Sequence, residues 1–162
     1  MAHVKNYAYN RCMAYEAGKT FAENRRARFD YDISETYEAG IELEGHEVKS
    51  IKAGRCSLNG SYALIRGNEA VLLNAEIPAY QPKNAPADYD SARTRRLLLH
   101  REETKRIAGR LHEKGLVLIP LRVYLKKNII KVALGLGRSR TKRDKREVIK
   151  KREAQREMRN AG

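Results

Sequence analysis

The sequence is poor in several residue types, and each scarcity excludes a class of protein. It has no Trp, and aromatic residues make up 7 % of its 162 residues, so a core must be built mainly from Val, Ile, Leu and Tyr. The two cysteines, Cys12 and Cys56, form no CxxC pair and indicate neither a disulfide framework nor a zinc site. The longest apolar run, residues 116–121, is far below the ~20 residues of a membrane-spanning helix. The N-terminus lacks the apolar stretch of a secretory signal, so we expect a cytoplasmic protein.

Motifs for catalysis and cofactor binding are also missing. The four histidines show no metal-ligand spacing, and the chain contains neither a P-loop nor a G-x-S-x-G motif. Gly135-Leu136-Gly137 begins like a dinucleotide-binding fingerprint, but Arg140 stands where the third glycine is needed. We therefore expect no enzymatic activity, no metal and no cofactor.

Positive charge, by contrast, is abundant and unevenly distributed. The chain has 34 Lys and Arg against 20 Asp and Glu, a net charge of +14, and the last 25 residues carry +7 of it. A cytoplasmic chain this basic most often binds nucleic acid. An anionic membrane surface is the weaker alternative, because the sizeable apolar residues of this tail are only Val148, Ile149 and Met158.

The basic tail, residues 138–162, has too few apolar residues to offset the entropy of ordering, about 1–2 kcal/mol per residue for the backbone. It nevertheless contains no Pro, and Glu147 precedes Lys151 by four residues, which favours a helix. We expect a tail that is disordered when free and helical when bound to an anionic partner. The alternative is a solvated tail without a specific role.

The central residues have the patterning of a small β-rich domain. Apolar residues alternate with polar ones from Phe29 into a strand within 29–43, and residues 61–66 and 70–75 predict a strand pair that turns at Gly67-Asn68. Residues 117–125 and 130–136 predict a second hairpin. Residues 101–114 predict a helix, residues 45–54 one or two helical turns, and residues 77–91 a long loop. We predict a mainly β fold with accessory helices, built as a small closed or nearly closed barrel.

Three groups of basic residues lie beside the predicted strands and are candidates for RNA phosphate contacts. They are Arg25, Arg26 and Arg28; Lys49 and Lys52; and Arg93 and Arg95. Each group alone is most simply a solvated surface. Together with the tail they favour phosphate contacts, which give affinity and salt dependence but little sequence specificity.

An ordered series of motifs resembles one protein family. The motifs are NRRARFDY at residues 24–31, YEAGI at 37–41, GHEVKSIKAG at 45–54, SY at 61–62, RTRRLLLH at 93–100, PL at 120–121 with Tyr124, and DKRE at 144–147. Over roughly residues 24–162 the chain is similar to the SmpB family, the SsrA-binding proteins of bacteria. The resemblance implies an OB-like barrel that binds transfer-messenger RNA (tmRNA) and delivers it to stalled ribosomes, where the nascent peptide is tagged in trans-translation. A generic OB-type RNA-binding or ribosome-associated protein is the alternative.

The resemblance also implies which residues contact RNA. The family's RNA-contacting positions fall on Glu38, Leu98 and His100. A carboxylate can accept hydrogen bonds from a guanine edge, and Leu and His can pack against unstacked bases. Each has an ordinary structural interpretation as well: an ion-paired strand carboxylate, a core leucine, and a neighbour of a helix N-cap.

For the tail, the resemblance implies a helix in the ribosomal decoding centre and the vacant mRNA channel. The residues expected there are Lys142, Arg143, Asp144, Lys145, Arg146, Val148, Ile149, Lys150 and Lys151. The chain departs from the family at Phe29, where His is common, at Ser139-Arg140-Thr141, where Gly-Lys-Lys is common, and at Arg143, where an aromatic residue or His is common. We expect three parts: a flexible extension (1–23), the barrel (24–137) and the tail (138–162).

Overall fold

The computed structural model describes residues 18–161, and the expected flexibility of the extension falls mostly outside them. The elements in chain order are β1 (Thr20–Glu23), α2 (Arg25–Asp30), β2 (Tyr31–Ile41), α3 (Gly45–Lys52), β3 (Tyr62–Arg66), β4 (Glu69–Leu73), the 3-10 turn η1 (Pro82–Asn84), β5 (Arg95–Leu98), α4 (Arg101–Leu111), β6 (Leu116–Lys126), β7 (Ile129–Ser139) and α5 (Lys142–Asn160). The predicted fold class, mainly β with helices, is confirmed.

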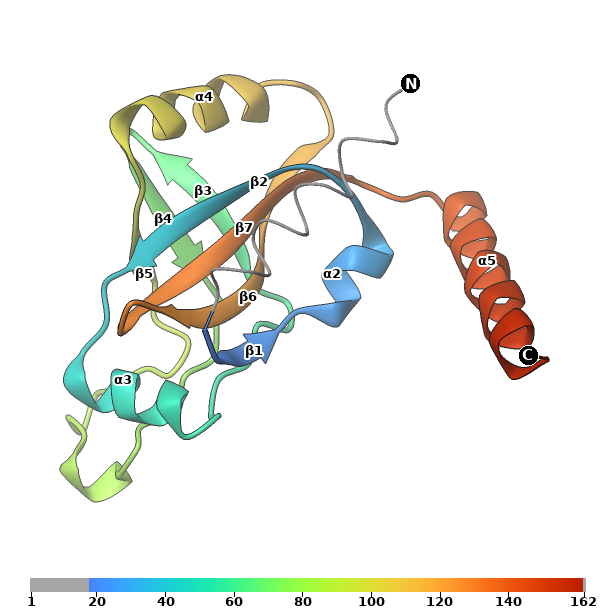
Figure 1. Ribbon diagram of the computed structural model, residues 1–162. Helices are drawn as coiled ribbons and strands as arrows, with labels where there is room; N and C mark the ends of the chain where they lie inside the picture. The colour runs from blue at the N-terminus through green and yellow to red at the C-terminus, as the bar shows by residue number, and fades with distance from the viewer. Residues whose placement is uncertain (1–17, 162) are drawn as a thin grey trace.

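The strands pair into one antiparallel sheet in the order β1-β6-β3-β4-β5-β2-β7, with an additional pairing of β6 with β7 (Figure 1). Because β6 pairs with both β3 and β7, the six strands from β2 to β7 form a closed ring of pairings, called here the strand ring. Strand β1 joins β6 at Arg122–Tyr124, beyond the point where β3 pairs with it. Both predicted hairpins are present, as β3–β4 and β6–β7.

Alternating side chains give the strand ring two separate apolar clusters. Leu118, Val132 and Leu134 belong to the larger cluster, which also takes in Ile51 of α3 and Ile107 of α4. Their chain neighbours Ile119 and Ala133 point to the opposite face and join the second cluster with Leu121, Tyr124 and Ala27 of α2. Helix α2 therefore covers part of the outer face of the β2–β7–β6 sheet.

Residues 25–30 form a helix, which corrects the prediction that the alternating strand begins at Phe29. The buried Asn24 caps α2: its Oδ1 accepts a hydrogen bond from the Ala27 N–H at 3.1 Å, and its Nδ2 donates to the Pro120 carbonyl at 3.1 Å. Strand β2 starts only at Tyr31.

The folded part extends further at both ends than the sequence predicted. Thr20–Glu23 of the expected flexible extension pair with β6 as strand β1. At the other end, Ser139 and Arg138 of β7 pair with Tyr31 and Asp32, so these first two residues of the expected tail belong to the strand ring. The segment that leaves the ring begins at residue 140.

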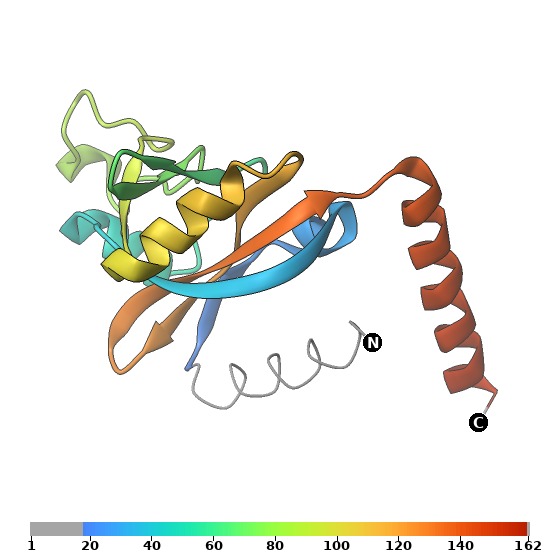
Figure 2. The ribbon, with the colours of Figure 1, turned by 90° about the horizontal axis from the view of Figure 1, so that it is seen from above.

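Helix α5 stands away from the strand ring (Figures 1 and 2). Thr141 caps it, and Asp144 completes a capping box with the Thr141 backbone. Its contacts with the body are made to α2: Lys145 Nζ lies 2.8 Å from Asp30 Oδ1, and the Arg152 guanidinium lies 5.7 Å from the Phe29 ring centre. A coil conformation of the free tail stays a prediction.

Two glycines form a matched test of the β2–β7 pairing. A Cβ on Gly137 would lie 2.4 Å from the Asp32 carbonyl oxygen, whereas a Cβ on Gly109, in α4, meets nothing within 4 Å. We expect Gly137→Ala to lower the free energy of unfolding by about 1–3 kcal/mol or more through overpacking. Gly109→Ala should raise it by about 0.5–1 kcal/mol through helix propensity. Urea unfolding of both variants measures the difference, and equal stabilities would contradict the close β2–β7 approach.

Candidate nucleic-acid interface

Glu38 lies on the outer face of β2 with its carboxylate held by two neighbours from β6. The Tyr124 hydroxyl donates to Glu38 Oε2, and Lys126 Nζ lies 3.0 and 3.2 Å from the two carboxylate oxygens. Partial burial acts to raise the pKa of Glu38, but the hydrogen bonds from Tyr124 and Lys126 outweigh it and lower the pKa overall. Glu38 is therefore an ionised, oriented acceptor, and its ion pair with Lys126 also fits the structural interpretation of a paired strand carboxylate.

Leu98 shares this outer face with Glu38. Gly40 of β2 lies two residues from Glu38 and pairs directly with Leu98 of β5, so the three positions share one side of the sheet. The missing side chain of Gly40 leaves room for Leu98, whose Cβ lies 3.2 Å from where a Gly40 Cβ would be. Leu98 is 52 % exposed. It is not a core residue, which removes the structural interpretation considered for it.

His100 follows Leu98 closely and is the N-cap residue of α4 itself. Its backbone N–H donates to Glu103 Oε2 at 3.1 Å in a capping box, and its side chain is exposed. The structure thus brings Glu38 and Leu98 together on one face and places His100 at the end of the adjoining strand, two residues after Leu98. This group is called the Glu38 surface below.

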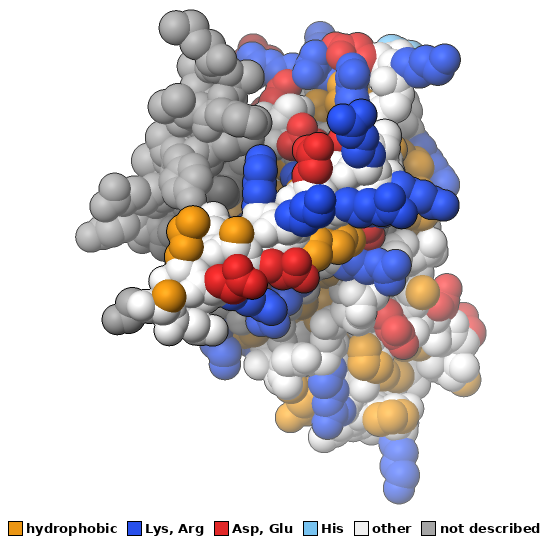
Figure 3. All heavy atoms as spheres, turned by 90° about the vertical axis from the view of Figure 1, so that its right-hand side faces the viewer, with side chains coloured by type: hydrophobic (Ala, Val, Ile, Leu, Met, Phe, Trp, Pro, Cys, Tyr) orange, Lys and Arg blue, Asp and Glu red, His pale blue; other side chains and the backbone are white. Residues whose placement is uncertain are grey.

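The first two basic groups are exposed on helices. The side chains of Arg25 and Arg26 are 90 % and 84 % exposed on α2, where Arg26 pairs with Asp30, and Arg28 is exposed beside them. Lys49 and Lys52 are exposed three residues apart on α3, hence on one helix face as predicted. Seen from the side that carries α5, Lys and Arg side chains gather across the molecule, with small groups of carboxylates between them (Figure 3).

The third basic group is different, and the expectation that Arg95 contacts phosphate is wrong. Arg95 is fully buried, and its Nε and Nη2 donate to Glu47 Oε1 at 3.0 and 2.8 Å. Its Nη1 donates to the Ala75 carbonyl at 2.7 Å. A guanidinium enclosed in this way cannot reach an RNA phosphate.

Arg93 also binds Glu47. It donates to both Glu47 oxygens, from Nε at 2.9 Å and from Nη2 at 2.6 Å, and its side chain is 30 % exposed. The Tyr89 hydroxyl lies 3.0 Å from Glu47 Oε1. Sequence reasoning missed Glu47, although its spacing of four residues from the buried Ile51 places it on the inward face of α3.

Burial acts to raise the pKa of Glu47, but hydrogen bonds from Arg93, Arg95 and the Glu44 backbone N–H outweigh it and lower the pKa to about 2. Because the pKa is depressed in the folded state, this carboxylate contributes stability fully above its ordinary value of 4.5. The contribution is lost as the pH falls toward about 2.

We expect Glu47→Gln to destabilise the fold by about 3–5 kcal/mol, because it leaves the buried Arg95 without its counter-charge. The variant should also lose part of the wild-type drop in melting temperature between pH 5 and pH 2, since the titrating group is gone. Thermal unfolding across this pH range measures both effects.

Glu69→Gln is the matched control. Glu69 pairs with Arg96 at 2.5 Å, but both side chains are about half exposed, so its loss should change stability by less than about 1 kcal/mol. Equal destabilisation by the two variants would contradict a special role for the Glu47 network.

Within residues 18–161, no helix is long and apolar enough to cross a membrane, and no three His, Cys, Asp or Glu side chains are grouped to hold a metal ion. The fold and the surface define a class of protein: an antiparallel β domain that displays cations on two short helices and a long basic helix. Such a surface suits a polyanion.

Comparisons with known proteins identify the family within this class. The family model described as SmpB protein matches residues 21–162. The SsrA-binding protein of Gloeothece citriformis is 48 % identical over 92 % of this chain and 97 % of its own length. That of Synechococcus elongatus is 48 % identical over 88 % and 93 %. A solved structure described as "tmRNA-SmpB: a journey to the center of the bacterial ribosome" is 45 % identical, with a TM-score of 0.62, and covers 78 % of this chain and 92 % of its own. The chain belongs to the SmpB family.

Proposed function

We propose that the protein binds tmRNA and delivers it to stalled ribosomes, where the nascent peptide is tagged and the ribosome is released. The observation that carries this proposal is the extent of the similarity: relatives named for SsrA binding match 88–92 % of the chain, and the family model runs from residue 21 through the basic helix. The protein acts by binding, without catalysis and without a cofactor, in the cytoplasm where ribosomes are found.

The strand ring supplies the tmRNA-binding part, with the closed pairing of six strands supporting an OB-like barrel. Glu38 offers an ionised acceptor for a base edge, and the exposed Leu98 and His100 offer contacts to unstacked bases. The exposed cations of α2 and α3 contact phosphates, which position the RNA without reading its sequence. Arg93 and Arg95 hold the fold instead.

The tail supplies the ribosome-binding part. Lys142 to Lys151 occupy the decoding centre and the vacant mRNA channel, where the helix forms on an anionic surface and replaces the signal of codon–anticodon pairing. Exposed cations such as Arg146 and Lys150 suit ribosomal RNA, and Arg143 can stack its planar guanidinium on a base. Val148 is half-buried and Ile149 is 42 % exposed, so this pair is available for an apolar contact.

Glu38→Ala tests specific recognition. We expect its affinity for the tRNA-like domain of tmRNA to fall by about 1–3 kcal/mol, because a base loses its acceptor. Its weak affinity for an unrelated RNA of equal length should stay unchanged or rise slightly, because a negative charge is removed. Dissociation constants for the two RNAs measure the difference.

Glu42→Ala is the control, since Glu42 is exposed just beyond β2 and its removal changes the net charge equally. Equal losses of affinity for both RNAs, together with a lower melting temperature of Glu38→Ala, would make Glu38 a purely structural residue.

Removal of residues 142–162 separates tmRNA binding from ribosome activation. The truncation begins after β7, so the strand ring should unfold at the wild-type temperature and bind tmRNA with modestly reduced affinity. Peptide tagging on ribosomes stalled without a stop codon should be lost. A full-length control with a shuffled tail of the same composition keeps the charge, and it should also fail to support tagging. Wild-type tagging by either variant would reduce the tail to a solubilising appendage.

A further inference from the structure

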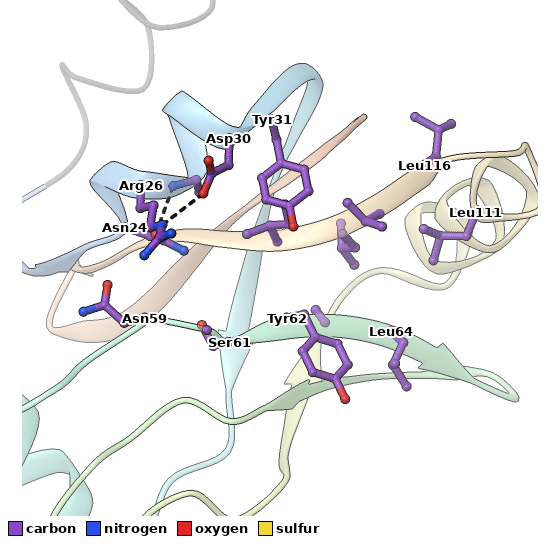
Figure 4. Close-up of a pocket in the computed structure, with 16 residues that line it drawn as sticks. Asn24, Arg26, Asp30, Tyr31, Asn59, Ser61, Tyr62, Leu64, Leu111 and Leu116 are labelled. Carbon is purple, nitrogen blue, oxygen red and sulfur yellow. Dashed lines mark hydrogen bonds and ion pairs between the residues drawn. The ribbon is translucent and has the colours of Figure 1, made fainter. Parts of the chain in front are cut away.

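A groove of about 720 Å³ opens in the wall of the strand ring (Figure 4). None of the residues of the Glu38 surface lines it. One wall is formed by α2 and the start of β2, and the other by residues 59–64, which lead into β3; the beginning of β6 closes it. The groove exists because two neighbouring strands of the ring pair over a very short length. Strands β3 and β6 pair only at Ala63 and Leu118, whereas β6 and β7 pair from Leu116 to Lys126. The groove is within the size range of small-ligand sites, ~300–1,000 Å³.

Two tyrosines from opposite walls line this groove (Figure 4). Tyr62 of β3 is 41 % exposed, and Tyr31 of β2 is half-buried. Neither hydroxyl makes a hydrogen bond to any residue in the described range 18–161, and the same holds for the side-chain amide of Asn59 at the end of the groove. The groove thus offers aromatic rings together with donors and acceptors that the protein itself does not use.

The charged and apolar residues that line the groove indicate what kind of ligand it can bind. Asp30 is the one carboxylate among the lining residues, and it is neutralised by Arg26 at 3.1 Å and Lys145 at 2.8 Å. Arg26 itself is 84 % exposed, so a cation lies at the entrance. Leu111 and Val117 are among the apolar side chains that line the groove. A flat aromatic group that carries a phosphate satisfies all these features, whereas an acidic peptide would leave the apolar and aromatic surface uncovered.

We propose that this groove binds one unstacked base of an RNA, with Tyr62 stacking on the base, the Asn59 amide meeting its edge and Arg26 meeting the adjoining phosphate. The inference rests on the proposed function only in taking RNA as the partner. Tyr31 begins β2 and Glu38 lies seven residues further along it, roughly 23 Å away at about 3.3 Å per residue. The protein would therefore hold two separate RNA segments at two places along this strand.

The test uses the full chain and four variants: Tyr62→Ala, Tyr62→Phe, Tyr80→Ala and Glu38→Ala. Tyr80 is the matched control, because it is 38 % exposed and lies outside the groove, beside Arg55. Dissociation constants are measured against the isolated tRNA-like domain of tmRNA and against purified small ribosomal subunits, since the unstacked base could come from either RNA. Thermal unfolding confirms that each variant is folded.

We expect Tyr62→Ala to weaken binding in one of the two arms by about 5- to 150-fold, the range that loss of one base–aromatic stack gives. The arm affected identifies the source of the base. Tyr62→Phe, which keeps the ring, and Tyr80→Ala should stay within about twofold of wild type. The proposal is overturned if Tyr62→Ala binds both RNAs like wild type, if Tyr62→Phe loses as much as Tyr62→Ala, or if Tyr80→Ala loses as much. Should Glu38→Ala weaken tmRNA binding while Tyr62→Ala weakens binding in neither arm, the groove proposal fails and the proposed function stands. Should neither variant weaken binding in either arm, the groove proposal and the recognition role of Glu38 both fail.

Discussion

The buried ion pair between Glu47 and Arg95 is the constraint on which the Glu38 surface depends. Both side chains are fully buried, and buried ions cost several kcal/mol each unless every donor and acceptor is satisfied. Glu47 meets this requirement with partners from the start of β5, the long loop before it and the N-terminus of α3. The pair therefore fixes where β5 begins. Leu98 ends that strand and His100 caps the next helix, so the Glu38 surface is built only if this network closes.

The part proposed to bind tmRNA and the part proposed to bind the ribosome differ in how their side chains are held in place. Glu38 is oriented during folding by Tyr124 and Lys126, so its carboxylate loses little further freedom when RNA arrives. Helix α5 has no buried residue, and packing cannot hold it as it holds β2. Under the proposed function a partner would complete its ordering, which would lower the affinity per unit of contact but make the helix responsive to whether the channel is vacant. The apolar residues that hold β2 in the strand ring are absent from α5, and this difference is what the proposed division between tmRNA binding and ribosome binding rests on.

Local patterns predicted the hairpins, whereas contacts distant in the chain decided what the sequence missed. Lys127 and Asn128 form the turn of the β6–β7 hairpin, with φ angles of 47° and 63° as a two-residue turn of this type requires. The alternation of apolar residues on both sides of this turn already predicted the hairpin. Arg95, in contrast, stands in a run of arginines that is indistinguishable from a surface cluster, and its partner Glu47 lies 48 residues away. The alternation from Phe29 likewise continued the strand pattern across the end of α2, whose cap Asn24 is held by Pro120, 96 residues distant. Leu98 became exposed because β5 lies beside Gly40, a pairing that no local pattern contains.

These long-range pairs also change what the net charge means. The slope with which RNA affinity falls as salt rises depends on the number of cations that contact phosphates, not on the net charge of the whole chain. Arg93 and Arg95 form ion pairs with Glu47, whereas α5 exposes most of its basic side chains. The cations available to RNA are therefore fewer than the 34 Lys and Arg of the chain, and exposed ones lie on α2, α3, α4 and α5. Because Lys145 links α5 to Asp30 of α2, these two basic helices lie next to each other at one side of the strand ring. An RNA segment bound at the proposed groove site beside α2 would lie close to the beginning of the tail, because Asp30 lines the groove and pairs with Lys145.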